Sequence, residues 1–128
     1  MNDTLKEAGG SGHYINAEGL TSGAVWGKTS PWVAIRGTVK DKDGEKPVTV
    51  AMYADPKGLN APPYWHARDY GLFAANAFDD HDFLNDKTKD GSITLQPGKS
   101  MRFRYRVVIH PGDTAAAHIN DLYRAWKP

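Results

Sequence analysis

Glycine and proline divide this chain into short segments. Its 128 residues include 13 glycines and 8 prolines. These turn-forming residues recur at intervals of roughly ten positions, a spacing typical of an all-β meander. We therefore expect a mainly β protein, an antiparallel β-sandwich with a C-terminal α-helix. A chain of this length forms one domain that buries about 70% of its unfolded surface. We assign residues 1–12 to a flexible lead or helix remnant and residues 13–128 to a single β-rich domain.

Strand-forming residues cluster in several of these segments. Residues 32–39 (WVAIRGTV) and 48–53 (VTVAMY) are β-branched and aromatic, and residues 40–47 between them supply turn residues and charge. This pattern predicts a β-hairpin. Residues 72–78 (LFAANAF) predict a further strand, and residues 92–95 (SITL) lead into another turn.

The clearest strand runs from Met101 to His110, where the alternation has a period of two. Its apolar positions are Met101, Phe103, Tyr105, Val107 and Ile109, and they alternate with Arg102, Arg104, Arg106, Val108 and His110. We expect the apolar face to join the core and the arginine face to be solvated or ion-paired. Asp113 or Thr114 then caps a helix whose apolar residues recur at helical spacing: Ile119, Leu122, Tyr123 and Trp126.

Composition excludes several classes of partner. The 16 basic and 15 acidic residues give a net charge of +1, without the basic excess of a nucleic-acid or anionic-membrane binder. There is no cysteine, so disulfides, thiolate metal sites and cysteine nucleophiles are excluded. The apolar runs are far shorter than the roughly 20 residues of a membrane span. We expect a soluble chain. These features leave its location open, and export of the full-length protein to the periplasm or the cell exterior agrees with them.

Residues 62–76 (PPYWHARDYGLFAAN) hold the densest group of functional side chains. Aromatic faces beside planar hydrogen-bonding groups suit a sugar, which is apolar on its faces and hydroxylated at its rim. For catalysis on a sugar, we expect His66 to act with Asp69 or Glu18 as acid and base. The expected substrate-binding residues are Tyr64 and Trp65, which would stack on the sugar, Arg68 and Asn76, which would hydrogen-bond it, and His110 at a strand end.

Each of these residues also has a structural interpretation. Large aromatic residues such as Trp26, Trp32 and Trp65 usually belong to the core. Arg68 and Asp69 can form a local ion pair. Glu18 can mark a turn, Asn16 and Asn76 can hydrogen-bond the backbone at strand ends, and His110 can serve the following Pro111–Gly112 turn.

We expect no metal and no cofactor. Five histidines and several aspartates could in principle converge, but their spacing lacks the patterns of ligands on one helix or strand. The residues concerned are His13, His66, His81, His110, His118, Asp69, Asp79, Asp80 and Asp82. Residues 78–91 are polar enough for an exposed loop, and calcium on its acidic oxygens is the metal that they would suit best.

Five short motifs together resemble the bacterial DUF6807 family, which is also labelled methane oxygenase PmoA. They are residues 16–19 (NAEG), 26–28 (WGK), 31–33 (PWV), 65–76 (WHARDYGLFAAN) and 103–112 (FRYRVVIHPG), and they occur in the family's order over nearly the whole chain. The resemblance is to the C-terminal half of the family's domain. It implies either a fragment or a naturally short relative.

The resemblance implies half of a galactose-mutarotase-like β-supersandwich, a fold shared by many carbohydrate-binding and carbohydrate-processing proteins. The family often has arginine where this chain has Thr29, which puts a cationic cluster there in doubt, and proline where this chain has Ala77. A membrane methane oxygenase needs apolar spans, so we do not expect that activity.

Three functions follow from these observations. The first is a carbohydrate-active enzyme, and the second is a non-catalytic carbohydrate-binding sandwich. The third is a structural half-domain that assembles with a second copy, as a homodimer, or with a missing N-terminal half. A half-sandwich would have an open strand edge and an uncovered apolar face.

Overall fold

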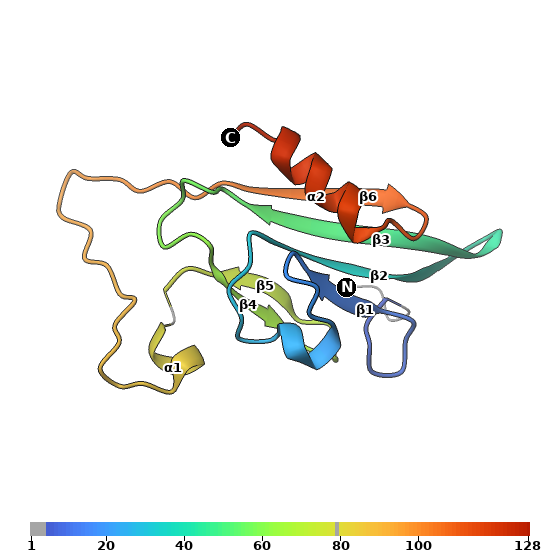
Figure 1. Cartoon of the computed structure of the whole chain (residues 1–128), viewed down its shortest axis with the longest axis horizontal. Helices are drawn as coiled ribbons and strands as arrows, with labels where there is room; N and C mark the ends of the chain where they lie inside the picture. The colour runs from blue at the N-terminus through green and yellow to red at the C-terminus, as the bar shows by residue number, and fades with distance from the viewer. Residues whose placement is uncertain (1–4, 79) are drawn as a thin grey trace.

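Two antiparallel sheets and a C-terminal helix form three layers in the computed structural model, which describes residues 5–78 and 80–128 (Figure 1). The mainly β fold with a C-terminal helix is thus confirmed. The elements are β1 (His13–Asn16), the short 3₁₀ helix η1 (Ser22–Val25), β2 (Trp32–Asp41), β3 (Gly44–Ala54), β4 (Tyr64–Ala67), β5 (Phe73–Asn76), α1 (Asp80–Leu84), β6 (Tyr105–Pro111) and α2 (Ala116–Ala125).

The larger sheet has the order β1-β2-β3-β6, and β4 pairs with β5 in a separate sheet of two strands. The predicted hairpin is confirmed as β2–β3, with a register that runs from Trp32 opposite Tyr53 to Asp41 opposite Gly44. Its turn is tighter than predicted, because Gly44 adopts a φ of 109°, which favours glycine. Lys46 and Pro47, expected in the turn, therefore belong to β3.

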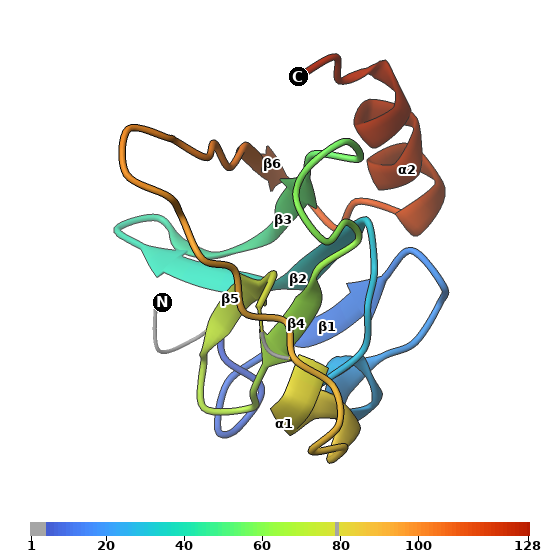
Figure 2. The same cartoon turned by 90° about the vertical axis from the view of Figure 1, so that its left-hand side faces the viewer.

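The two faces of the larger sheet pack against different layers. Strand alternation directs Trp32, Ala34, Ala51 and Tyr53 to the face that carries Ile119 of α2, which we call the α2 face. The opposite face packs against β4 and β5, and its buried core contains Tyr14, Val33, Ile35, Trp65 and Ala67. Figure 2 shows α1 and α2 on opposite sides of this arrangement.

Strand β6 differs from its prediction. It begins at Tyr105 and not at Met101, and the apolar face expected in the core is exposed. Tyr105 is 42% exposed, Val107 55% and Ile109 69%. The reason is that the core formed with the smaller sheet extends over β1, β2 and β3 and does not include the described residues of β6. Among residues 5–78 and 80–128, no strand pairs with the outer edge of β6.

Three further expectations are corrected or narrowed. The predicted strand over residues 72–78 is present as the shorter β5. Residues 92–95, expected only to lead into a turn, are in no strand, and the turn is present at residues 97–98. The expected loop over residues 78–91 contains α1. The N-cap of α2 is Ala115, because Asp113 forms an ion pair with Arg36 and the Thr114 amide donates to Thr49 Oγ1.

The described part of the N-terminal segment is a series of turns packed on the sheet. Leu5 is only 4% exposed, and residues 1–4 lie outside the described part of the chain. A Cβ on Gly12 would overlap the Leu5 carbonyl, so glycine permits the close approach of these two backbone segments. No helix of the described residues is long and apolar enough to span a bilayer.

Candidate functional site

Alternation along β4 decides which side chains of the predicted site lie together. Trp65 and Ala67 point into the buried core, whereas Tyr64 and His66 point away from it and contact Phe83 of α1. Arg68 follows β4, and its guanidinium carbon lies 4.2 Å from the centroid of the Trp26 ring. The outer side of β4 therefore carries a continuous group of aromatic and cationic side chains.

Phe83 is the centre of the aromatic part of this group. Its ring stacks on Tyr64 with centroids 4.9 Å apart, and it lies 4.7 Å from the His66 ring and 5.6 Å from the Trp26 ring. Burial, with smaller contributions from the charge of Asp80 and a hydrogen bond to it, raises the pKa of Tyr64. Phe83 was not predicted as a site residue. The available signal was an aromatic residue inside a polar stretch.

A hollow of about 430 Å³ lies beside this group. It is lined by Glu7, Gly23, Trp26, Ala67, Arg68 and Asp69. Residues that carry an indole, a guanidinium and two carboxylates thus line one space, whose volume is within the range of about 300–1,000 Å³ that is usual for ligand pockets. Arg68 and Asp69 were predicted site residues, whereas Glu7 was not, because the segment that contains it lacked a clear pattern.

Backbone hydrogen bonds hold the walls of the hollow together. The Ala8 amide donates to the Asp69 carbonyl at 2.9 Å, and Arg68 and Leu72 are joined at 2.9 Å across a turn that contains Gly71 at φ 102°. Glu7 is held through its side chain, since Glu7 Oε1 accepts from the Tyr14 amide at 2.9 Å. Burial, together with the Glu7 carboxylate, raises the pKa of Tyr14 to about 12.

Trp65 belongs to the core and not to a ligand-binding surface. Its side chain is fully buried, and its indole Nε1 donates to the Ser30 carbonyl at 2.8 Å. Both faces of the ring are thus withdrawn from any ligand in this structure, so the predicted stacking of Trp65 on a sugar is corrected. Trp26, at the end of η1, is the tryptophan that lines the hollow.

The remaining predicted site residues do not line this hollow. Glu18 is exposed in the turn after β1. The Asn76 side chain accepts a hydrogen bond from the Phe78 amide at 2.9 Å. His110 lies in β6, with its ring 5.8 Å from that of His118. His66 contacts Phe83, and so the structure does not bring the expected catalytic residues His66, Asp69 and Glu18 together around one space.

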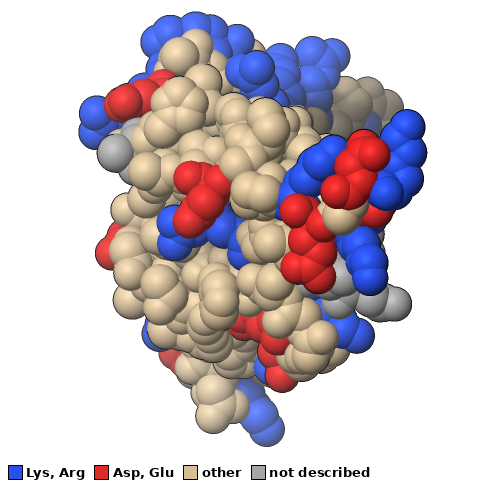
Figure 3. Space-filling view, turned by 90° about the vertical axis from the view of Figure 1, so that its right-hand side faces the viewer, with Lys and Arg blue, Asp and Glu red and all other residues tan. Residues whose placement is uncertain are grey.

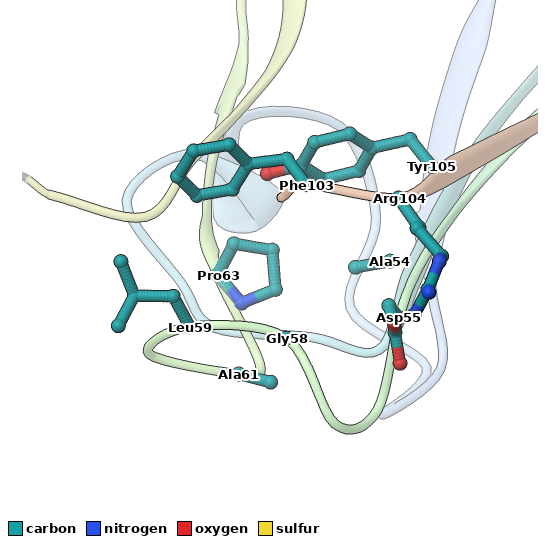
Figure 4. A pocket seen from close by; sticks show the side chains of 9 residues that line it. All are labelled: Ala54, Asp55, Gly58, Leu59, Ala61, Pro63, Phe103, Arg104 and Tyr105. Carbon is teal, nitrogen blue, oxygen red and sulfur yellow. Dashed lines mark hydrogen bonds and ion pairs between the residues drawn. The ribbon is translucent and has the colours of Figure 1, made fainter. Parts of the chain in front are cut away.

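A second, smaller cavity is lined in part by an ion pair. Asp55 is 7% exposed and accepts from Arg104 Nη1 at 3.3 Å. Figure 4 shows Arg104 reaching toward Asp55, with the Phe103 and Tyr105 rings on the side of Pro63. The space that water can occupy there is about 10 Å³, enough for a water molecule and too small for a sugar.

Metal ligands do not converge in the described part of the chain. Within it, no group of three or more histidine, aspartate or glutamate residues has the geometry of a metal site. His81 Nδ1 and Asp82 Oδ1 lie 2.8 Å apart on the exposed side of α1. Asp79, one of the acidic residues considered from the sequence, lies outside the described residues.

Comparison with known proteins gives a match at the level of the family. A model described as a family of unknown function, DUF6807, matches residues 1–124. No curated protein and no solved structure matches the chain.

Proposed function

The chain belongs to the DUF6807 family, and from this premise we propose that it binds a saccharide in the hollow between Trp26, Arg68 and Asp69. One observation carries the proposal: an indole, a guanidinium and two carboxylates line the same space of about 430 Å³. This set combines an apolar surface for a sugar ring with donors and acceptors for its hydroxyl groups.

The residues have different roles in this proposal. The planar guanidinium of Arg68 donates to ring hydroxyls, or to the carboxylate of a uronic acid. Asp69 and Glu7 accept hydrogen bonds from hydroxyls. Arg68 already packs on the Trp26 ring, and this contact holds both side chains in place before a ligand arrives, which lowers the entropy lost on binding.

Binding is supported more directly than turnover. Sugar chemistry by acid–base catalysis needs a proton donor and a proton acceptor at the same ligand. His66 packs on Phe83, so the histidine and carboxylate expected from the sequence lie at different places. The carboxylates that line the hollow, Glu7 and Asp69, are the groups to examine if a bound saccharide is also converted.

The proposal is tested by a thermal-shift screen against mono- and oligosaccharides and uronic acids. A ligand present at 100 times its dissociation constant should add about 2.7 kcal/mol to the free energy of unfolding. We expect Arg68→Gln and Asp69→Asn to abolish this stabilisation. His66→Ala is the matched control from the same segment, and we expect it to retain binding. If His66→Ala abolishes binding while Arg68→Gln and Asp69→Asn retain it, the ligand binds elsewhere, and the assignment to this hollow is overturned.

A second candidate function, self-association through β6, is favoured by a separate observation. Tyr105, Val107 and Ile109 form an exposed apolar face on a strand whose outer edge is unpaired within the described residues. Antiparallel pairing of β6 with a second copy, about a twofold axis at Val107, places Val107 opposite itself and Tyr105 opposite Ile109. The strand is therefore self-complementary.

Light scattering as a function of protein concentration tests this candidate. We expect a dimer that dissociates on dilution, and a monomer when Val107 and Ile109 are both changed to lysine, because the charges oppose burial. Leu84→Lys, at an exposed apolar position of α1, is the control that should leave the dimer intact. A wild-type chain that stays monomeric at high concentration contradicts self-association.

A further inference from the structure

A row of polar side chains crosses the four-stranded sheet at one register. His13 lies opposite Arg36, Arg36 opposite Thr49, and Thr49 opposite His110. Because residues that face each other in a sheet share a side, all four belong to the α2 face. Next to them on this face is the apolar contact between Ala34, Ala51 and Ile119, so the row marks where the core under α2 gives way to polar groups.

One end of this row opens into a hollow of about 290 Å³. Its lining consists of Ser11, His13, Arg36, Gly37, Thr38, Pro47 and Asp113. The hollow lies on the α2 face, whereas Trp26 and Arg68 lie on the other side of the molecule with β4 and α1. It is therefore distinct from the saccharide site proposed above.

The hydrogen-bonding capacity of Arg36 is only partly used. Its Nη1 lies 3.2 Å from Asp113 Oδ1, and this is the ion pair that the structure shows for the guanidinium. Its Nε is buried and has no hydrogen-bond partner among the described residues. A guanidinium offers five N–H donors, and a group with two or three oxygen atoms satisfies more of them than one carboxylate oxygen does.

Asp113 is suited to be an exchangeable counterion. Its side chain is 69% exposed, and an ion pair with such an exposed group contributes little to stability, because water screens it. The loop that carries it is held independently, because Thr49 Oγ1 donates to the Gly112 carbonyl and accepts from the Thr114 amide. Asp113 can thus release Arg36 while its loop stays in place.

We propose that this hollow binds an oxyanion, a carboxylate or phosphate group, with Arg36 as its principal donor and His13 as a second one. Asp113 neutralises Arg36 when the hollow is empty and is displaced by the ligand. Figure 3, a view from the side of the β2–β3 turn, shows basic side chains along the upper edge of the molecule, and acidic and basic side chains next to one another over the rest of this face. The site accordingly selects a small anion and not an extended polyanion.

Titration with inorganic phosphate, and separately with succinate, tests this proposal by NMR of the backbone amides. We expect saturable shifts at residues 11–13, 36–38 and 113. Arg36→Gln should weaken binding by about tenfold or more, because it removes a charge-assisted contact. Asp113→Asn should strengthen binding, because it removes the competing carboxylate. If the ion pair between Arg36 and Asp113 has only a structural role, the two substitutions should not change anion binding in opposite directions.

Arg104→Gln is the matched control, since Arg104 also pairs with an aspartate, Asp55, at 3.3 Å but lies outside this hollow. It should leave the titration unchanged. If Arg36→Gln does not fold, Arg36→Lys and His13→Gln provide the same comparison. A response to inorganic phosphate and not to succinate identifies the bound group as a phosphate, and the reverse identifies it as a carboxylate. Absence of a saturable response in the wild type, or an equal response in the Arg36 variant, overturns the proposal.

Discussion

At the scale of single residues, neighbours in the predicted site have different environments. Trp65 is fully buried and hydrogen-bonded to the Ser30 carbonyl, whereas Arg68 is exposed and lies on the Trp26 ring. The first contributes to stability through burial, and the second is available for binding. Their substitutions should therefore separate the two properties.

Trp65→Ala should lower the free energy of unfolding by about 3–5 kcal/mol, since it removes a large core side chain and leaves a cavity. Arg68→Ala should lower it by about 1 kcal/mol or less, the contribution of a cation–π contact at an exposed site. Urea denaturation followed by far-UV circular dichroism measures both values. Equal effects of the two substitutions would contradict the assignment of Trp65 to the core.

Tyr14 should make stability depend on pH in the alkaline range. Its pKa is about 12 in the folded protein, because of burial and the Glu7 carboxylate, and about 10 when unfolded. Between these values the folded state binds more protons than the unfolded state, so stability falls as pH rises, whereas below pH 10 the contribution is fully present. Denaturation at several alkaline pH values should show a smaller loss for Tyr14→Phe than for the wild type.

At the scale of elements, the start of α2 shows how a tertiary contact overrides a local signal. Asp113 and Thr114 are good N-cap residues. However, Asp113 forms an ion pair with Arg36 of the sheet, and the Thr114 amide donates to Thr49 Oγ1. The helix therefore begins after Ala115, whose side chain makes no capping hydrogen bond.

Ala115→Ser should stabilise the protein by about 0.5–2 kcal/mol, because Ala115 already has the extended backbone of an N-cap residue, with φ −63° and ψ 146°. The serine hydroxyl would then accept a hydrogen bond from the first turn of α2. The shift of the thermal midpoint gives the measurement, and Ala115→Val, which has no acceptor, serves as control. A decrease in stability with serine would show that the helix begins at another residue.

At the scale of the whole molecule, the two proposed sites lie on different sides of the larger sheet. The saccharide hollow is formed by β4, η1 and the N-terminal turns, and the oxyanion hollow lies on the α2 face. Among the residues that the structure describes, none lines both of them. The buried cores on either side of β2 separate the two sites.

Substitutions in the two hollows should therefore act independently. The change in the free energy of unfolding for a double variant, Arg36→Gln with Arg68→Gln, should equal the sum of the single changes within about 0.5 kcal/mol. Phosphate binding should likewise be unaffected by Arg68→Gln. Denaturation of the four proteins and one titration check this, and a larger interaction energy would show that the sites are coupled.

The candidate site could be predicted from the sequence only in part. Tyr64 and His66 lie on the outer side of β4, and Arg68 and Asp69, which line the hollow, follow directly after this strand in the same dense segment. Glu7 and Phe83 were not predicted, because they reach this region from other segments of the chain, and the one signal for Phe83 was an aromatic residue inside a polar stretch. Trp65 was misplaced because it is a buried member of a strand that the sequence did not identify.

The sequence by itself determined the properties that depend on neighbouring residues. Turn residues and β-branched segments specified the β2–β3 hairpin, and apolar spacing specified the C-terminal helix. Tertiary structure alone decided burial, since a period of two separates the faces of β6 but does not say which layer covers each face. It also decided which side chains meet, because the walls of both hollows come from different strands and turns.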